Sequence, residues 1–264
     1  MTKVINEREL ALDMLIEIHE REQYSHLVLR DVLNKYQYLE KQERAFLTRL
    51  TEGTTEHLLE MDFIINSFSK VKVKKMKPLI RNLLRMSVYQ LKYMDSVPVS
   101  AVCNEAVKLA KKRGFKSLAG FVNGILRNMD RQPEKLMIPQ DNLSVMYSQP
   151  EWLVDTWTKE YGTDQTKAMF EYFLQEQPLT VRVCKNRISV DDFKKRMDAH
   201  GVAAVQNPWV TEAFELKGFD YLGALPEFNE GLCTVQDVSS MLVAKAAHVS
   251  PADKVIDVCA APGG

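Results

Sequence analysis

The last residues of the sequence, 253–264, carry the pattern with the most specific chemical meaning. A largely apolar run over 255–258 passes into small residues and ends in Gly263-Gly264. Glycines let a ligand approach the backbone closely, and a helix that follows such a turn offers free N–H groups. We therefore predict a buried strand over 253–258 and then a loop that contacts a nucleotide-type cofactor. Turns of this kind also occur in many other folds.

Four cysteines, Cys103, Cys184, Cys233 and Cys259, are further candidates for direct chemistry. No two of them form a C-x-x-C pair, so we expect neither a disulfide framework nor a structural zinc site. The first three fall in helix-like or strand-like patterns and are predicted to be buried apolar fillers. We expect no metal site in this chain.

The third group of functional candidates is electrostatic. The chain has 35 Lys+Arg and 35 Asp+Glu, but residues 70–116 hold 13 of these bases and only two of the acids, Asp95 and Glu105. Concentrated positive charge usually faces phosphate, so we predict that this segment binds the RNA backbone. The candidate contacts are Lys72, Lys74, Lys75, Arg81, Arg85, Lys111, Lys112 and Arg113.

Two alternatives to RNA binding remain open for the basic segment. Lysines at the end of a helix complement its dipole, which accounts for the cluster over 108–116. The cluster over 70–77 precedes a helix, where cations oppose the dipole, so RNA binding is preferred there. The segment could instead bind an acidic surface of a protein partner. Aromatic residues are few, so base stacking by this part of the chain is not expected.

The first half of the chain must position these cations, and its pattern is helical throughout. Apolar residues recur at helical spacing and predict a bundle of about six helices. Asn6 with Glu9 predicts a capping box, and Gly53 predicts a helix break. Gly120 and Gly124 lie four apart in the last helix, where they are predicted to allow close helix–helix packing. Weakening of a surface helix is the alternative.

The second half changes to an α/β pattern. A polar stretch with prolines marks a linker, and short helices follow over 151–161 and 163–175. A β-α-β-β order over 179–216 then predicts a small mixed sheet with helices on one side, a topology shared by RNA-recognition modules and by many unrelated folds. Arg182 and Arg187 are candidate phosphate contacts there, and an exposed polar strand edge is an equally open interpretation.

Composition limits the remaining possibilities. With 45% hydrophobic and 27% charged residues, the chain is not disordered, collagen-like or a coiled coil. The N-terminus lacks an apolar signal segment, and no apolar stretch reaches the length of about 18 residues that a membrane span needs. We expect a reduced, soluble, cytoplasmic protein with no membrane association.

Several motifs in the expected order resemble one family. Residues 257–264 (Asp-Val-Cys-Ala-Ala-Pro-Gly-Gly) and 235–240 (Val-Gln-Asp-Val-Ser-Ser) are similar to motif I and its upstream helix in the RNA 5-methylcytosine methyltransferases. Residues 98–107 and 121–127 resemble the NusB-like domain of the Sun-type (RsmB) branch, and residues 147–152 resemble the segment that opens its middle domain. The resemblance covers nearly the whole chain.

This resemblance implies an S-adenosylmethionine-dependent transfer of methyl to C5 of a cytosine, with small-subunit (16S) ribosomal RNA as the partner. In the family a cysteine thiolate adds to C6 of a base held out of its stack, and C5 then attacks the methyl group. The residues that match the cofactor-contacting loop are Cys259, Ala260, Ala261, Pro262, Gly263 and Gly264.

The sequence departs from the family pattern at its end. The family's lysine after motif I, its acidic ribose-binding residue and both its cysteines would lie beyond Gly264, so no catalytic residue is assigned within 1–264. We expect a partial copy of an enzyme that binds RNA and is inactive by itself. The alternative is a non-enzymatic, NusB-like RNA-binding or assembly protein with a vestigial methyltransferase start.

The expected fold class is therefore multi-domain. An all-α, NusB-like, RNA-binding bundle over 1–135 and a linker over 136–150 precede a small α/β domain of RRM or ferredoxin-like type over 151–230. Residues 231–264 are expected to supply the first helix and strand of a Rossmann-like methyltransferase domain.

Overall fold

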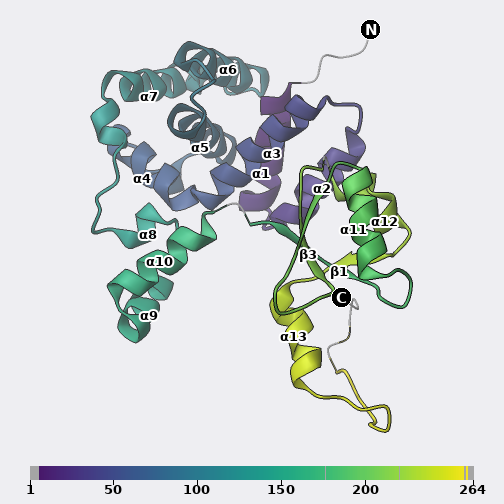
Figure 1. Ribbon diagram of the computed structural model, residues 1–264. Coiled ribbons are helices and arrows are strands. Elements are labelled where there is room, and N and C mark those ends of the chain that lie inside the picture. The colour runs from purple at the N-terminus through teal and green to yellow at the C-terminus, as the bar shows by residue number, and fades with distance from the viewer. Residues whose placement is uncertain (1–5, 176, 220, 259, 261–264) are drawn as a thin grey trace. The chain divides into compact units, whose positions relative to one another are not determined.

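The chain divides into two compact units, Met1–Gln175 and Glu176–Gly264 (Figure 1). The computed structural model describes residues 6–175, 177–219, 221–258 and 260. The first unit is built of helices and the second carries a four-stranded sheet, which confirms the predicted order of an all-α part followed by an α/β part. The domain limits expected at residues 135, 150 and 230 stay predictions.

A helical bundle occupies most of the first unit. Its elements are α1 (Glu7–Glu20), α2 (Ser25–Lys35), α3 (Lys41–Glu56), α4 (Leu58–Phe68), η1 (Val73–Lys75), α5 (Pro78–Tyr93), α6 (Val99–Lys112), η2 (Lys116–Leu118) and α7 (Ala119–Arg131). Asn6 caps α1, because its Oδ1 accepts a hydrogen bond from the Glu9 N–H at 2.9 Å. This confirms one half of the predicted capping box, while the Glu9 carboxylate pairs with Lys112 of α6. Helix α5 packs against α1, α3, α4, α6 and α7, so its Leu83 and Val88 are fully buried in the core.

Gly53 does not break a helix, contrary to the sequence prediction. Helix α3 continues to Glu56, and the chain turns at His57 before α4. A Cβ atom at Gly53 would overlap the ring of Tyr89 on α5. The glycine therefore serves close packing between α3 and α5, which local sequence patterns do not reveal.

The two glycines of α7 have the opposite environment. Helix α7 packs through an apolar face that includes the buried Val122 and Leu126. Gly120 and Gly124 are exposed, and no atom lies within 4 Å of a Cβ placed at either position. The predicted role of these glycines in helix–helix packing is therefore wrong.

The chain between the bundle and the sheet is itself folded. It contains η3 (Pro133–Leu136), α8 (Leu143–Met146), α9 (Glu151–Tyr161) and α10 (Thr163–Phe173). Lys92 Nζ donates to the Leu136 carbonyl at 3.1 Å, and the Glu60 N–H donates to Ser148 Oγ at 3.3 Å. These bonds hold the stretch predicted as a linker against the bundle, and a small separate core forms around Phe170.

The second unit has a β-α-β-β-α-β order. Its elements are β1 (Leu179–Val183), α11 (Val190–Ala199), β2 (Ala203–Gln206), β3 (Ala213–Lys217), η4 (Leu222–Ala224), α12 (Pro226–Asn229), β4 (Cys233–Val235) and α13 (Val238–Ala246). The strands are antiparallel in the order β2-β3-β1-β4, which is the ferredoxin-like arrangement. Its core buries Val181, Phe193 and Phe214 between the sheet and α11. The predicted β-α-β-β order is confirmed, but every described strand pair is antiparallel, so the expected mixed sheet is wrong.

Strand β4 lies where the sequence predicted the start of another domain. Cys233 pairs with Val183 and Thr234 pairs with Arg182, so the strand completes the same sheet. A strand of 3 residues is too short to show an alternating pattern. Only the pairing of β4 with β1 identifies β4 as part of the ferredoxin-like sheet.

Residues 253–258 do not form the predicted strand. Val255, Ile256 and Val258 are 64%, 85% and 88% exposed in irregular backbone. A strand of a parallel sheet needs neighbouring strands to pair its backbone and helices to cover both of its faces. Within the described residues no element does this for the segment, so its apolar side chains face solvent.

Candidate nucleic-acid interface

Exposed lysines cluster on the segment that joins α4 to α5. Lys72, Lys74 and Lys75 are exposed and have no ion-pair partner among the described residues. The backbone beneath them is anchored, because Val73 is buried and its N–H donates to Asn66 Oδ1 at 2.9 Å. An ordered turn thus presents three free cations to solvent, which suits attraction of a phosphate chain.

The two arginines of α5, both candidate RNA contacts, are engaged inside the bundle. Arg81 Nε donates to Glu20 Oε1 at 2.7 Å. Arg85 is 8% exposed, and its Nε and Nη2 donate to the two carboxylate oxygens of Asp62, each at 2.7 Å. These ion pairs connect α5 to α1 and α4. Arg81 and Arg85 thus join helices to one another, and the free cations of the basic segment lie elsewhere.

The end of α6 mixes paired and free cations. Lys112 Nζ lies 2.5 Å from Glu9, and Arg113 Nη1 lies 2.6 Å from Asp13. Both pairs reach solvent, where an ion pair contributes little and a phosphate can compete for the cation. Lys111 has no ion pair among the residues described and lines a groove instead.

Two shallow grooves run along the sides of α7. The first, of about 400 Å³, lies toward α6 and is lined by Asn104, Lys108, Lys111, Ala119, Gly120 and Asn123 together with Val107. The second, of about 300 Å³, lies toward the end of α4 and is lined by Phe68, Ser69, Lys70, Val71, Phe121, Gly124 and Ile125. Sequence reasoning did not single out the two asparagines, because only the pairing of α6 with α7 brings them together.

The arginines of the ferredoxin-like sheet have different surroundings. Arg187 is exposed, and its Nη1 donates to the carbonyls of Glu230 and Gly231 at 2.9 and 3.3 Å, which ties the turn after β1 to the turn before β4. Arg182 lies on β1 opposite Thr234 of β4 and is partly buried; its Nε has no hydrogen-bond partner in the described chain. Both remain predicted phosphate contacts.

The described residues provide only a fragment of the expected cofactor loop. Cys259, Ala261, Pro262, Gly263 and Gly264 lie outside the described residues, and Ala260 is exposed. The described cysteines are shielded instead. Cys103 and Cys233 are buried, which confirms that these two cysteines are core fillers, and Cys184 is half-buried. Burial raises the pKa of the Cys233 thiol to about 11, so it is not a thiolate at neutral pH.

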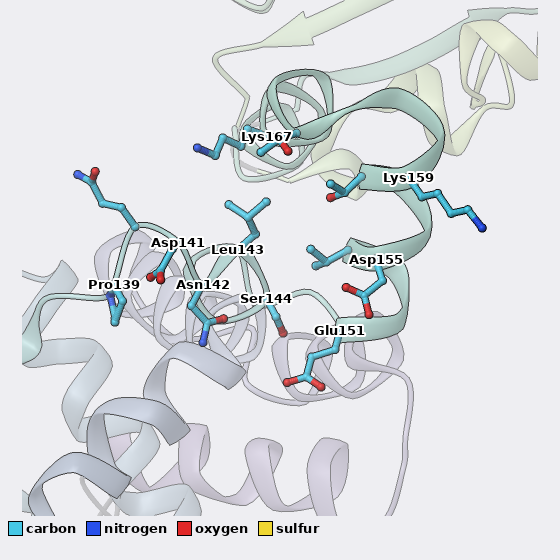
Figure 2. A pocket seen from close by; sticks show the side chains of 13 residues that line it. Pro139, Asp141, Asn142, Leu143, Ser144, Glu151, Asp155, Lys159 and Lys167 are labelled. Carbon is cyan, nitrogen blue, oxygen red and sulfur yellow. The ribbon is translucent and has the colours of Figure 1, made fainter.

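A larger groove, of about 1090 Å³, lies between residues 139–144 and helices α9 and α10. Figure 2 shows that Asp141, Glu151 and Asp155 border this groove, while Lys159 points outward. Three carboxylates against two lysines, Lys159 and Lys167, give the lining a net negative charge, so the groove suits a phosphate chain less well than a lining of lysines alone. Among the described residues no group of three His, Cys, Asp or Glu side chains is arranged to hold a metal, and no helix is long and apolar enough to cross a membrane.

Comparison with known proteins shows what this chain is similar to. Residues 5–131 match the NusB family, and residues 149–220 match the Methyltr_RsmF/B-like, ferredoxin-like domain. The crystal structure of PH0851 superposes with a TM-score of 0.69 over 93% of this chain and 56% of that chain, at 19% identity, and so shares the fold.

Relatives by sequence cover nearly the whole chain. The "Probable ribosomal RNA small subunit methyltransferase B" of Bacillus subtilis (strain 168) is 35% identical over 97% of this chain and 58% of its own length. A protein of the same name from Synechocystis sp. is 32% identical over 99% of this chain and 59% of its own length. The chain thus spans less than two thirds of the length of these relatives. Residues 5–131 belong to the NusB family and residues 149–220 to the RsmF/B-like ferredoxin-like domains, in a chain related throughout to proteins named ribosomal RNA small subunit methyltransferase B.

Proposed function

We propose that this chain is the RNA-binding part of an S-adenosylmethionine-dependent methyltransferase that forms 5-methylcytosine in small-subunit ribosomal RNA. The observation that carries the proposal is the set of free lysines, Lys72, Lys74 and Lys75, on an anchored turn of the NusB-family domain. Relatives named as ribosomal RNA small subunit methyltransferases support the RNA class. Because the chain spans 58% and 59% of those relatives, the activity is proposed for a protein that contains it.

The chain's own contribution is to hold the RNA. Lysines on the turn between α4 and α5 attract the phosphate backbone, and each contact releases a condensed counterion, so binding weakens as salt rises. A cytosine must also be presented unstacked from its neighbours. Holding the RNA strand on the same chain as the proposed cofactor loop keeps the target base available for that step.

S-adenosylmethionine, when bound, supplies the electrophilic methyl group. The described residues do not by themselves fit this cofactor, because the side chains of Val255 and Ile256, just before the expected cofactor loop, are 64% and 85% exposed. We therefore assign no catalytic step to them. The proposed cofactor contacts remain Cys259, Ala260, Ala261, Pro262, Gly263 and Gly264, in a protein where further elements cover this loop.

Two measurements test the proposal. The 264-residue chain is expected to bind small-subunit ribosomal RNA and to transfer no methyl group to it. A protein extended through the rest of a methyltransferase domain is expected to transfer labelled methyl from S-adenosylmethionine to C5 of a cytosine in that RNA. Labelling of another base, or of protein, would contradict the proposal. RNA binding by the extended protein without transfer would instead support a NusB-like assembly protein.

A further inference from the structure

We infer that the two grooves beside α7 form one binding surface for the sugar–phosphate backbone of single-stranded RNA, which crosses α7 between them. The inference rests on the proposed RNA binding and specifies where the strand passes. It adds Asn104 and Asn123, which the sequence pattern does not single out as contacts. It also selects Lys70, Lys108 and Lys111 from the basic clusters over 70–77 and 108–116.

The charge around the grooves favours an anionic occupant. Lys108 and Lys111 line the groove toward α6, and Lys70 lines the groove toward α4. No carboxylate of the described chain lines either groove, in contrast to the larger groove bordered by Asp141 and Glu151. Lys108 has one ion pair, with Glu105 at 2.7 Å, but it is 71% exposed and free to exchange that partner.

Amide side chains beside the lysines of the groove toward α6 add hydrogen-bonding groups that suit a sugar–phosphate chain. Asn104 and Asn123 are exposed on neighbouring helices and face the same groove as the lysines. Amide N–H and carbonyl groups can bond both phosphate oxygens and ribose hydroxyls. The surface thus offers charge for the phosphates and neutral donors and acceptors for the sugars between them.

The face of α7 between the two grooves carries two glycines, Gly120 and Gly124. Gly120 borders the first groove and Gly124 the second, and these residues lie one turn apart on the same face of α7. Nothing in the described chain occupies the space above either glycine. Gly124 lies in the interior of α7, where glycine lowers helix stability, and Gly120 lies in the first turn. Neither position makes a close packing contact with the described chain. Their absent side chains leave the path between the grooves open.

Filling this face of α7 tests this path. The variant Gly120→Gln/Gly124→Gln adds two neutral side chains with higher helix propensity than glycine, so its Tm is expected to equal or exceed that of the wild type. The matched control is Ala45→Gln, which adds a similar side chain on the exposed face of α3, away from both grooves. Fluorescence anisotropy with a labelled single-stranded RNA of about 20 nucleotides, at several salt concentrations, measures affinity and salt slope.

We expect the double glycine variant to raise Kd about tenfold and to lower the salt slope by about one for each displaced phosphate, while Ala45→Gln changes neither. Lys108→Gln/Lys111→Gln should weaken binding similarly. Its effect should not add fully to that of the glycine changes, because both remove contacts with the same stretch of RNA.

The remaining outcomes differ in what they overturn. If the wild-type chain binds RNA with a steep salt slope but the glycine variant matches Ala45→Gln, the path across α7 is wrong while the proposed function stands. If the wild-type chain does not bind RNA, the proposed function itself fails. If a polyglutamate peptide binds and only that binding is lost in Lys108→Gln/Lys111→Gln, the surface serves an acidic protein partner, and the inference is overturned.

Discussion

Tyr93 Oη donates a hydrogen bond to Glu60 Oε2 at 2.8 Å, at a carboxylate that is only 2% exposed. His57 Nδ1 lies 2.7 Å from the same oxygen, and Lys92 forms an ion pair with the other one. Burial acts to raise the pKa of Glu60, but the hydrogen bonds from His57, Lys92 and Tyr93 outweigh it and hold that pKa below its usual range. Because Lys92 also bonds the Leu136 carbonyl, this network fastens the chain after α7 to α4 and α5.

Removing the Glu60 carboxylate should therefore destabilise the first unit strongly. Glu60→Ala leaves the Lys92 ammonium partly buried without its partner, and losing one member of such a pair costs about 3–5 kcal/mol. Urea unfolding of the chain measures the change. The exposed Glu56→Gln on α3 is the control and is expected to shift stability by less than about 0.5 kcal/mol. A Glu60→Ala effect as small as that of the control would contradict the network's role.

His19 should make stability depend on pH in a mildly acidic window. Burial, with a smaller contribution from Arg85, lowers the pKa of His19 from 6.5 to about 4. As pH falls below 6.5, His19 of the unfolded chain becomes protonated, whereas His19 of the folded chain stays neutral until about pH 4. The stability contributed by the neutral ring is thus complete above pH 6.5 and is lost progressively between 6.5 and 4, by about 3 kcal/mol.

Denaturant unfolding across that window tests the assignment. His19→Gln is expected to flatten the decline in stability between pH 6.5 and about 4.5. The exposed His26→Gln on α2 provides the comparison and should keep the wild-type slope. An unchanged slope in His19→Gln would mean that carboxylates, not this imidazole, govern the window.

Two glycine-to-alanine changes should act in opposite directions. At Gly53 the new methyl group meets the Tyr89 ring, so overpacking should destabilise the chain by about 1–3 kcal/mol. At Gly124, in the interior of α7, the methyl group meets no other atom, and the gain in helix propensity should stabilise the chain by about 0.5–1 kcal/mol. Equilibrium unfolding measures the change in the free energy of unfolding for both variants, and the m-value is expected to stay unchanged. Two changes of the same sign would refute the environments described for these glycines.

Charge reversal on the turn between α4 and α5 should weaken RNA binding. Changing Lys72, Lys74 and Lys75 to Glu is expected to reduce the slope of log affinity against log salt by about one for each lost phosphate contact. The triple variant Lys35→Glu/Lys159→Glu/Lys194→Glu makes the same change in net charge at exposed sites elsewhere on the chain. Equal losses in the two triple variants would mean that only overall charge matters, and not this turn.

Much of the architecture followed from local patterns. Helical spacing predicted the bundle, the Asn6 cap predicted the start of α1, and the change of period predicted β1, α11, β2 and β3. Local patterns did not reveal β4, because its 3 residues become a strand only through pairing with β1. The strand expected over 253–258 failed for the related reason that pairing partners, which the pattern presupposes, are absent from the described residues.

The sequence by itself determined that a basic segment exists, where the helices run, and that the chain carries a motif typical of a cofactor loop. Only the tertiary structure decided which cations are free. Arg81 and Arg85 lie in the same basic segment as Lys72, yet their partners Glu20 and Asp62 come from 61 and 23 residues away along the chain. The tertiary structure also places the Tyr89 ring against Gly53 and no side chain against Gly120. Charge pairing and burial depend on contacts between residues far apart in the sequence, and local residue spacing does not predict those contacts.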